Sequence, residues 1–561
     1  MNQICQHCGA KKIPDETHFL CCHNGKVAFP PLSPFTQVLQ DLFTGKYVDR
    51  NANGNFLKHI RNYNACLSFA SFKATVVQPI NHGPPYFKIC GQIYHRVGGE
   101  RRRYNLPSHD EVAVVFVGEV GALPTSRDVF IYPRGHLLKI VSSKSVNLDR
   151  MIYPLFFPRG GAGWHNQLVH NPARATLVRN HVTLSQFYNY RLSIRQFFCL
   201  LFYGKKLFQQ YGVDAYVNID GQCLAFIRNN QNKLRSEQYD ALNEHLNKIA
   251  NERNVRPGRV VILPSSYVGS PRALKKIFED AMAIIKKYGK PDLFITFTCN
   301  PKWCEITENL YPGQTPNDRP DLVTRVFKLK LNNLNDIFKH GVIGKSCYAC
   351  SDLVVNRELY DIIKACMIHD PCGILIPNSP CIKDKVRSKN YPKEFNANTV
   401  AVQNGYPQYR RHDDGLVINF KGNNVDNRWM VPYNPWLSKE YEAHINVETC
   451  MSVKAVKYLY KYIYKGHDCA NCRYVSAPEA LWRIFEYPIV NMSHTIFRLK
   501  IHLPENQIVN FREGEEQVAL HRAAQRDTHR LYLWNTYKVF MMEDFIHRQV
   551  PFILAKQATP R

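Results

Sequence analysis

The sequence predicts a multidomain protein in which strand-rich and helical regions follow one another, an arrangement typical of the α+β class. Residues 31–170 contain strand-like runs such as 112–117, whereas residues 180–290 have the apolar spacing of helices. Hydrophobic residues make up 45% of the 561 residues and charged residues 21%, so the chain can bury a core. Its length suggests about three or four domains.

The net charge of +27 indicates an anionic partner, most plausibly nucleic acid. A basic enzyme unrelated to nucleic acid is the alternative that charge alone leaves open. The chain begins without the basic leader and apolar core of a signal peptide, and no apolar run approaches the ~20 residues of a membrane span. We therefore expect a soluble intracellular protein, whose 18 cysteines are thiols or metal ligands rather than disulfides.

The first 30 residues contain a candidate structural zinc site made of four cysteines: Cys5, Cys8, Cys21 and Cys22. A Cys-x2-Cys turn followed by Gly9 presents two thiolates, and a second pair after a short loop can close a tetrahedral Zn²⁺ site. Because the second pair is adjacent rather than Cys-x2-Cys, His23 and His7 are alternative ligands. A set of free cysteines is the interpretation without a metal.

Further along, apolar spacing predicts helices over 184–204 and 230–251. Another helix is expected from Ser270 to Gly289, with proline in its first turn. The clearest strand is 291–301, which is rich in β-branched and aromatic residues and is bracketed by prolines. A helix is then expected over 318–334.

The segment from Lys457 to Gly466 carries four tyrosines that alternate with lysines and aliphatic residues. Alternation suggests a strand, but a stretch without proline or glycine that ends at Gly466 favours a helix. On that helix, Tyr458 and Tyr462 lie one turn apart, away from an apolar stripe that includes Tyr460. Three lysines lie beside them: Lys454, Lys461 and Lys465. Two phenols on a basic face suit nucleophilic attack on a DNA phosphate, although the motif alone favours packing aromatics.

Blocks spread over nearly the whole chain carry a resemblance to one family: 269–272, 289–303, 318–327, 367–373, 405–407, 427–434, 444–448 and the tyrosine segment. The chain resembles the replication-initiator (Rep) and helicase proteins of Helitron rolling-circle transposons. The resemblance implies an HUH endonuclease with two tyrosines, Tyr458 as nucleophile and Tyr462 as the second nucleophile for strand transfer. Lys454, Lys461 and Lys465 would then lie near the phosphate.

The resemblance also implies the fold, an α+β nuclease domain with a central, mostly antiparallel sheet and flanking helices. A strand-rich N-terminal domain and a small zinc module would precede it. The expected partners are single-stranded DNA and transposon ends, in the nucleus. The expected domains are a zinc module (1–30), a strand-rich, candidate DNA-binding domain (31–170), a Helitron helicase-like region (171–345), the rest of the nuclease with the tyrosine helix (346–475), and a connector toward a helicase domain (476–561).

Two motifs of the family are missing from the sequence. Relatives bind Mg²⁺ or Mn²⁺ through a His-x-His strand, but no two of the 22 histidines here are separated by a single residue. That strand would follow Lys345, so we interpret the gap as a deletion or a missed exon. No stretch fits the P-loop pattern, so ATP is not an expected partner. The sequence leaves three hypotheses: a nicking enzyme, a DNA-binding remnant that does not cut, and a decayed fragment without activity.

Overall fold

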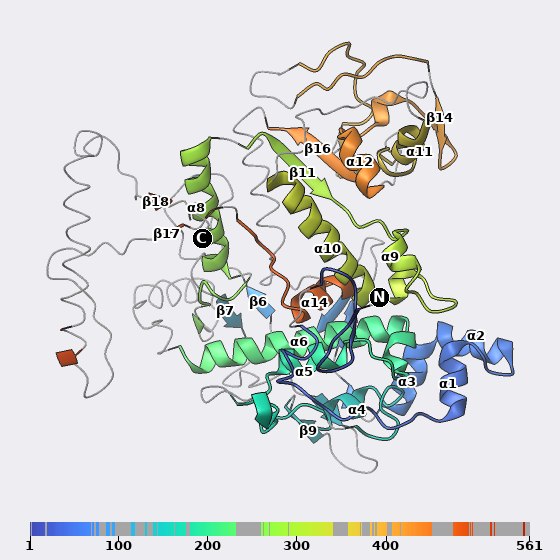
Figure 1. Cartoon of the computed structure of the whole chain (residues 1–561), viewed down its shortest axis with the longest axis vertical. Coiled ribbons are helices and arrows are strands. Elements are labelled where there is room, and N and C mark those ends of the chain that lie inside the picture. Colours follow the sequence, from blue (N-terminus) through green and yellow to red (C-terminus); the bar gives the residue numbers. More distant parts are fainter. Residues whose placement is uncertain are drawn as a thin grey trace. The chain divides into compact units, whose positions relative to one another are not determined.

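The computed structural model describes residues 1–68, 139–231, 260–339, 357–372, 390–450 and 475–497, with short gaps inside these ranges, and isolated short segments elsewhere. The chain divides into two compact units (Figure 1). The first unit comprises Met1–Lys276 and Pro291–Ile489, and the second comprises Ile277–Lys290 and Val490–Arg561. Each unit is described by itself.

Helices dominate the first part of the first unit: α1 (Gln37–Thr44), α2 (Arg50–Lys58), α3 (Ile60–Leu67), α4 (Leu148–Ile152), α5 (Leu184–Arg191) and α6 (Lys206–Asn229). The side chain of Asp49 caps α2, and Thr183 forms a capping box at the start of α5. Region 31–170, expected to be strand-rich, therefore opens with three helices. Their apolar residues Phe43, Phe56 and Ile60 are buried in the same core.

One predicted helix is shorter than expected. The expected helix over 184–204 ends at Arg191, and the chain then turns into a short 3-10 helix, Leu200–Tyr203, before α6 begins. Ser193 Oγ donates to the carbonyl of Asn189 at 2.7 Å, a local hydrogen bond that competes with continued helix. The predicted helix over 230–251 lies largely outside the described residues.

The core around α4, α5 and α6 is organised by a buried carboxylate. Asp149 accepts hydrogen bonds from Tyr188 Oη at 3.1 Å and Tyr211 Oη at 3.2 Å, and pairs with Arg191 at 2.9 Å. The Arg191 guanidinium also lies 4.5 Å from the ring centre of Phe187. Burial, together with the charge of Asp149, raises the pKa of Tyr188 and of Tyr211. This network joins the three helices through polar groups that water does not reach.

The second part of the first unit is built on the antiparallel pair β11 (Leu293–Phe297) and β16 (Ile445–Thr449). Ile295 faces Val447 across the pair, and residues on this side pack with α10 (Pro320–Lys339) in one hydrophobic core. The strand predicted over 291–301 is confirmed, as is the helix predicted to begin near residue 318. The expected helix from Ser270 is also confirmed, as α8 (Pro271–Tyr288).

The remaining helices of the first unit are α9 (Cys304–Thr307), α11 (Arg357–Cys366), α12 (Pro435–Tyr441) and α14 (Ala477–Ile484). All strand ladders among the described residues are antiparallel. The other paired strands are β1 (Gln3–Ile4) with β2 (Lys11–Lys12), β3 (Ala70–Ser71) with β8 (Val129–Ile131) and β9 (Lys139–Val141), β4 (Ala74–Val77) with β5 (Tyr86–Ile89), β6 (Ile93–His95) with β7 (Val114–Val117) and β10 (Val260–Val261), β12 (Ile382–Lys383) with β13 (Val386–Arg387), β14 (Ile418–Phe420) with β15 (Asn423–Val425), and, in the second unit, β17 (Ile496–Phe497) with β18 (Leu554–Ala555). Helices combined with small antiparallel sheets agree with the predicted α+β class. In the described part of the chain, no helix has the length and apolar character to cross a bilayer.

Helix α14 fastens the chain after the tyrosine segment to the first unit. Its Leu481 and Ile484 are fully buried in the core that α6 also lines. Thr324 Oγ1 of α10 donates to the carbonyl of Pro478 at 3.1 Å. The helix therefore contacts both α6 and α10, and the described residues 476–489 belong to the same compact unit as the sheet.

Candidate metal centre and the tyrosine segment

The four predicted cysteines converge on one point. The sulfur atoms of Cys5, Cys8, Cys21 and Cys22 all lie within 4.8 Å of one another. Cys22 Sγ is 3.8 Å from Cys5 Sγ and 3.9 Å from Cys21 Sγ. A tetrahedral zinc ion with Zn–S bonds of ~2.3 Å requires sulfur–sulfur separations of about 3.8 Å. The spacing of the thiols therefore fits a tetrahedral ion with four sulfur ligands.

Two tight turns bring the sulfurs together. In the first, between β1 and β2, Gly9 N–H donates to the carbonyl of Cys5 at 2.9 Å, and Gly9 adopts a φ of +67°. In the second, His23, Asn24 and Gly25 all have positive φ, which folds the chain back immediately after Cys22. Gly25 N–H then donates to Cys22 Sγ at 3.2 Å. This bend allows the sulfur atoms of the adjacent Cys21 and Cys22 to lie in one cluster.

The thiols of the cluster also shift one another's pKa values. Hydrogen bonds from the thiols of Cys21 and Cys22 lower the pKa of Cys8, while hydrogen bonding with Cys22 raises the pKa of Cys21. The thiolate of Cys8 is thus stabilised by hydrogen bonds from the neighbouring thiols. Four thiolates at this separation repel one another unless a cation lies between them, so the donor set suits a divalent ion that prefers sulfur.

Neither alternative histidine belongs to the cluster. His7 is exposed and packs beside Gly25, where an added Cβ would lie 3.3 Å from the His7 side chain. His23 is half-buried, and burial lowers the pKa of its imidazole. The structure therefore supports the set of four cysteines among the ligand sets that the sequence allowed.

A buried ion pair joins the segment that carries the four cysteines, here called the cysteine module, to α10. Arg325 donates from Nε and Nη2 to the two carboxylate oxygens of Glu16, both at 2.5 Å, and Nη2 also donates to the carbonyl of Lys11 at 3.0 Å. The side chains are 9% and 8% exposed. Although burial by itself lowers the pKa of Arg325, the Glu16 carboxylate reverses this effect and raises it.

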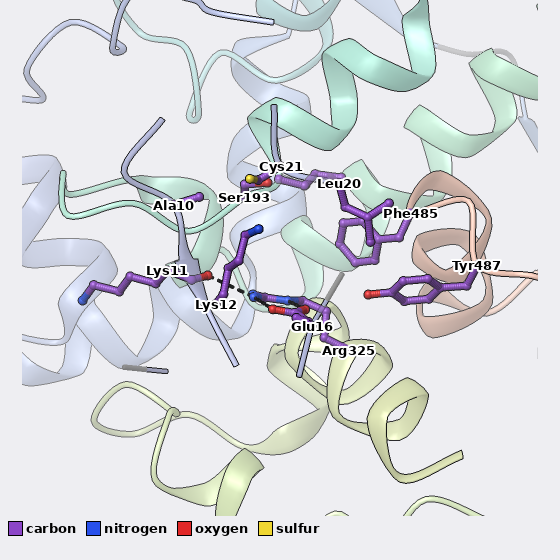
Figure 2. Close-up of a pocket in the computed structure, with 11 residues that line it drawn as sticks. Ala10, Lys11, Lys12, Glu16, Leu20, Cys21, Ser193, Arg325, Phe485 and Tyr487 are labelled. Atoms are coloured by element: carbon purple, nitrogen blue, oxygen red, sulfur yellow. Dashed lines mark hydrogen bonds and ion pairs between the residues drawn. The ribbon is translucent and has the colours of Figure 1, made fainter. Parts of the chain in front are cut away.

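Figure 2 shows this contact, with Arg325 between Glu16 and the backbone of Lys11. A cavity of about 30 Å³ adjoins it, and Cys21, Phe485 and Tyr487 are among its lining residues. A cavity of this size can hold only one or two waters, so it is not a substrate pocket. It lies where the cysteine module, α10 and the segment after α14 meet. Nothing in the sequence signals the Glu16–Arg325 pair, whose members are 309 positions apart.

A second arginine holds the module from the side of α5. Arg195 Nε donates to the carbonyl of Cys8 at 3.1 Å, and its guanidinium lies 3.7 Å from the ring centre of Tyr190. The cysteine module is therefore built into the first unit from two sides.

The predicted catalytic residues Tyr458 and Tyr462 lie outside the described residues, as do Lys454, Lys461 and Lys465. Their roles stay predictions. Both flanks of the segment are described. On one side Cys450 is buried and its N–H donates to the carbonyl of Asp292 at 2.8 Å, and on the other Ser476 caps α14. The described residues before and after this stretch, Cys450 and Ser476, thus both belong to the first unit.

The strand that leads into this segment carries a polar side. Asn446 and Glu448 share the face of β16 opposite Ile445 and Val447, and Asn446 Nδ2 donates to Glu448 Oε1 at 2.8 Å. His444 lies two positions before Asn446, and its Nδ1 forms a hydrogen bond with the carbonyl oxygen of Cys366 at 2.7 Å. The sequence identified this stretch only as a block of family resemblance.

Residues 187–350 match the family model of the Helitron helicase-like domain at the N-terminus. Over these residues the chain is similar to that domain. The match supports a Helitron-related protein and confirms the predicted resemblance at that level. A search of the curated proteins found no match to the chain. The Helitron helicase-like domain includes α6, β11 and α10, so Arg325 joins the cysteine module directly to the matched region.

Proposed function

We propose that this Helitron-related protein binds single-stranded DNA of transposon ends in the nucleus without cutting it. Two observations support this function. The match over 187–350 relates the chain to Helitron proteins, and the net charge of +27 favours binding to the negatively charged phosphate backbone. In the same proposal, Cys5, Cys8, Cys21 and Cys22 hold a zinc ion whose role is structural.

The test is a binding titration of the full chain with a labelled single-stranded oligonucleotide over a range of salt concentrations. Affinity should fall steeply and linearly on a log–log plot, because each phosphate contact releases a counterion. A duplex of the same sequence measures the preference for single strands. Absence of binding, or binding that does not respond to salt, would contradict the proposal.

A second candidate function is nicking and strand transfer through tyrosine. It is supported by the match over 187–350 and by the tyrosines and lysines of the segment from Lys457 to Gly466. Tyr458 Oη would attack the phosphorus, the bond from phosphorus to the 3′ oxygen would break, and the leaving 3′ hydroxyl would take a proton. Mg²⁺ or Mn²⁺ would polarise the phosphate in intact relatives, whereas this sequence has no His-x-His pair.

One assay distinguishes the two candidate functions. The full chain is incubated with a single-stranded oligonucleotide and Mn²⁺ or Mg²⁺, and covalent protein–DNA adducts are separated under denaturing conditions. The non-cutting proposal expects no adduct with any metal. An adduct that Tyr458→Phe abolishes and Tyr460→Phe preserves would replace it with the nicking function.

A further inference from the structure

Four exposed cations lie close together in sequence between the end of α1 and α3: Lys46, Arg50, Lys58 and Arg61. We call them the α2–α3 basic face. None of the four forms an ion pair with any residue that the structure describes. Some exposed cations elsewhere in the first unit have acidic partners, as in the pair Lys421–Asp370 at 2.6 Å. The face therefore carries positive charge that no ion pair among the described residues offsets.

The local acidic residues are already engaged. Residues 45–68 contain a single carboxylate, Asp49. Its Oδ1 accepts from the N–H groups of Asn51 at 2.8 Å and Ala52 at 3.1 Å, which caps the start of α2. Asp41, just before this stretch, accepts from Gln37 Nε2 at 2.9 Å. Asp49 keeps its negative charge while it caps α2, so residues 45–68 carry four cations against one carboxylate.

The backbone beneath the face is firmly held. Phe56 and Ile60 are buried in the main core, and Asn64 Nδ2 donates to the carbonyl of Ile152 at 2.7 Å. Asn53 Nδ2 joins α2 to α1 through the carbonyl of Leu42 at 2.6 Å. Figure 1 shows α1 and α2 side by side, with α3 next to α6. The cations thus project from a rigid support, which lowers the ordering cost of binding.

The neighbouring exposed residues suit a nucleic acid. Asn51, Asn55 and Asn62 are exposed, so amide donors lie close in sequence to the cations. Tyr63 is 41% exposed, and its ring centre lies 5.4 Å from that of Phe56, so one side is packed while the other faces solvent. Single-stranded DNA binders combine such cations with an aromatic ring on which a base stacks.

We propose that the α2–α3 basic face binds the phosphate backbone of single-stranded DNA, with Tyr63 as a stacking surface for a base. This inference rests on the proposed DNA-binding function. It assigns the contact to residues outside both the matched region 187–350 and the tyrosine segment. Four phosphates would each meet one cation, so the face would carry a defined share of the salt dependence of binding.

The test compares two variants of equal charge. The first carries Lys46→Gln, Arg50→Gln, Lys58→Gln and Arg61→Gln. The matched control removes four cations that are already ion-paired: Lys339→Gln, Arg357→Gln, Lys421→Gln and Lys439→Gln. Binding of a labelled single-stranded oligonucleotide is measured over a salt series. With a slope of about 0.7 per phosphate contact, the first variant should lose about 3 from the log–log slope and on the order of 10²-fold in affinity at 0.1 M salt.

A third variant, Lys46→Arg, Arg50→Lys, Lys58→Arg and Arg61→Lys, keeps the charge and should bind like wild type. Wild-type affinity and slope in the first variant would overturn this inference while leaving the DNA-binding function intact. An equal loss in the ion-paired control would overturn it as well, because general charge would then explain the effect. A wild-type protein that binds no DNA would remove both the proposed function and this inference.

Discussion

The contact between Glu16 and Arg325 gives the sharpest prediction about how the cysteine module is held. Glu16→Gln preserves the shape of the side chain but removes its charge, leaving a buried guanidinium beside a neutral amide. Arg325 makes two of its three oxygen contacts with Glu16, and both side chains are more than nine-tenths buried. Breaking a buried pair by removing one partner typically costs ~3–5 kcal/mol, so we expect about 3 kcal/mol for this substitution.

The assay follows urea unfolding of the first unit together with release of bound zinc to a coloured chelator. Glu16→Gln should shift both transitions to lower urea and release zinc sooner. The double variant Glu16→Gln/Arg325→Met removes the buried charge and should recover most of the loss, giving a coupling free energy of ~1–3 kcal/mol. The control Glu358→Gln breaks the exposed pair with Lys439 and should cost less than ~1 kcal/mol.

The reasoning would be refuted if Glu16→Gln behaved like Glu358→Gln in both measurements. It would also be refuted if the double variant were as unstable as the sum of its two single variants. Either result would mean that the ion pair does not join the cysteine module to α10.

Three further predictions concern other groups of the first unit. Cys8→Ser should lower zinc content, measured by elemental analysis, whereas Cys66→Ser, an exposed cysteine outside the cluster, should leave it unchanged. Asp149→Ala should destabilise the first unit by ~3–5 kcal/mol in a urea melt, because it leaves the buried charge of Arg191 unpaired; a loss below 1 kcal/mol would contradict the network. Burial raises the pKa of Cys299 to about 12, so the unfolded thiol ionises first, and stability should fall as pH rises from about 9 toward 12. The difference in melting temperature between wild type and Cys299→Ala should therefore change over that pH range, and a constant difference would argue against a buried thiol.

The sequence by itself was sufficient where structure depends on local signals. The Cys-x2-Cys turn with Gly9, the strand around 293–297 and the helix from Pro320 are all encoded within a few neighbouring residues. The family resemblance was likewise readable from blocks of sequence, and residues 187–350 confirm it at the level of a Helitron-related protein. Helical phase selects Tyr458 and Tyr462 as the reactive pair, which stays a prediction.

Tertiary structure decided what depends on distant residues. It brings the sulfur atoms of Cys21 and Cys22 close to that of Cys5. The bend that does so has three successive positive φ angles, which the spacing of the cysteines does not predict. It joins Glu16 to Arg325 across 309 positions, and returns α14 to the core beside α6. The physical reason is the same in each case. Turn and helix signals arise from backbone geometry over a few residues, whereas burial and charge pairing depend on which surfaces meet after the chain has folded.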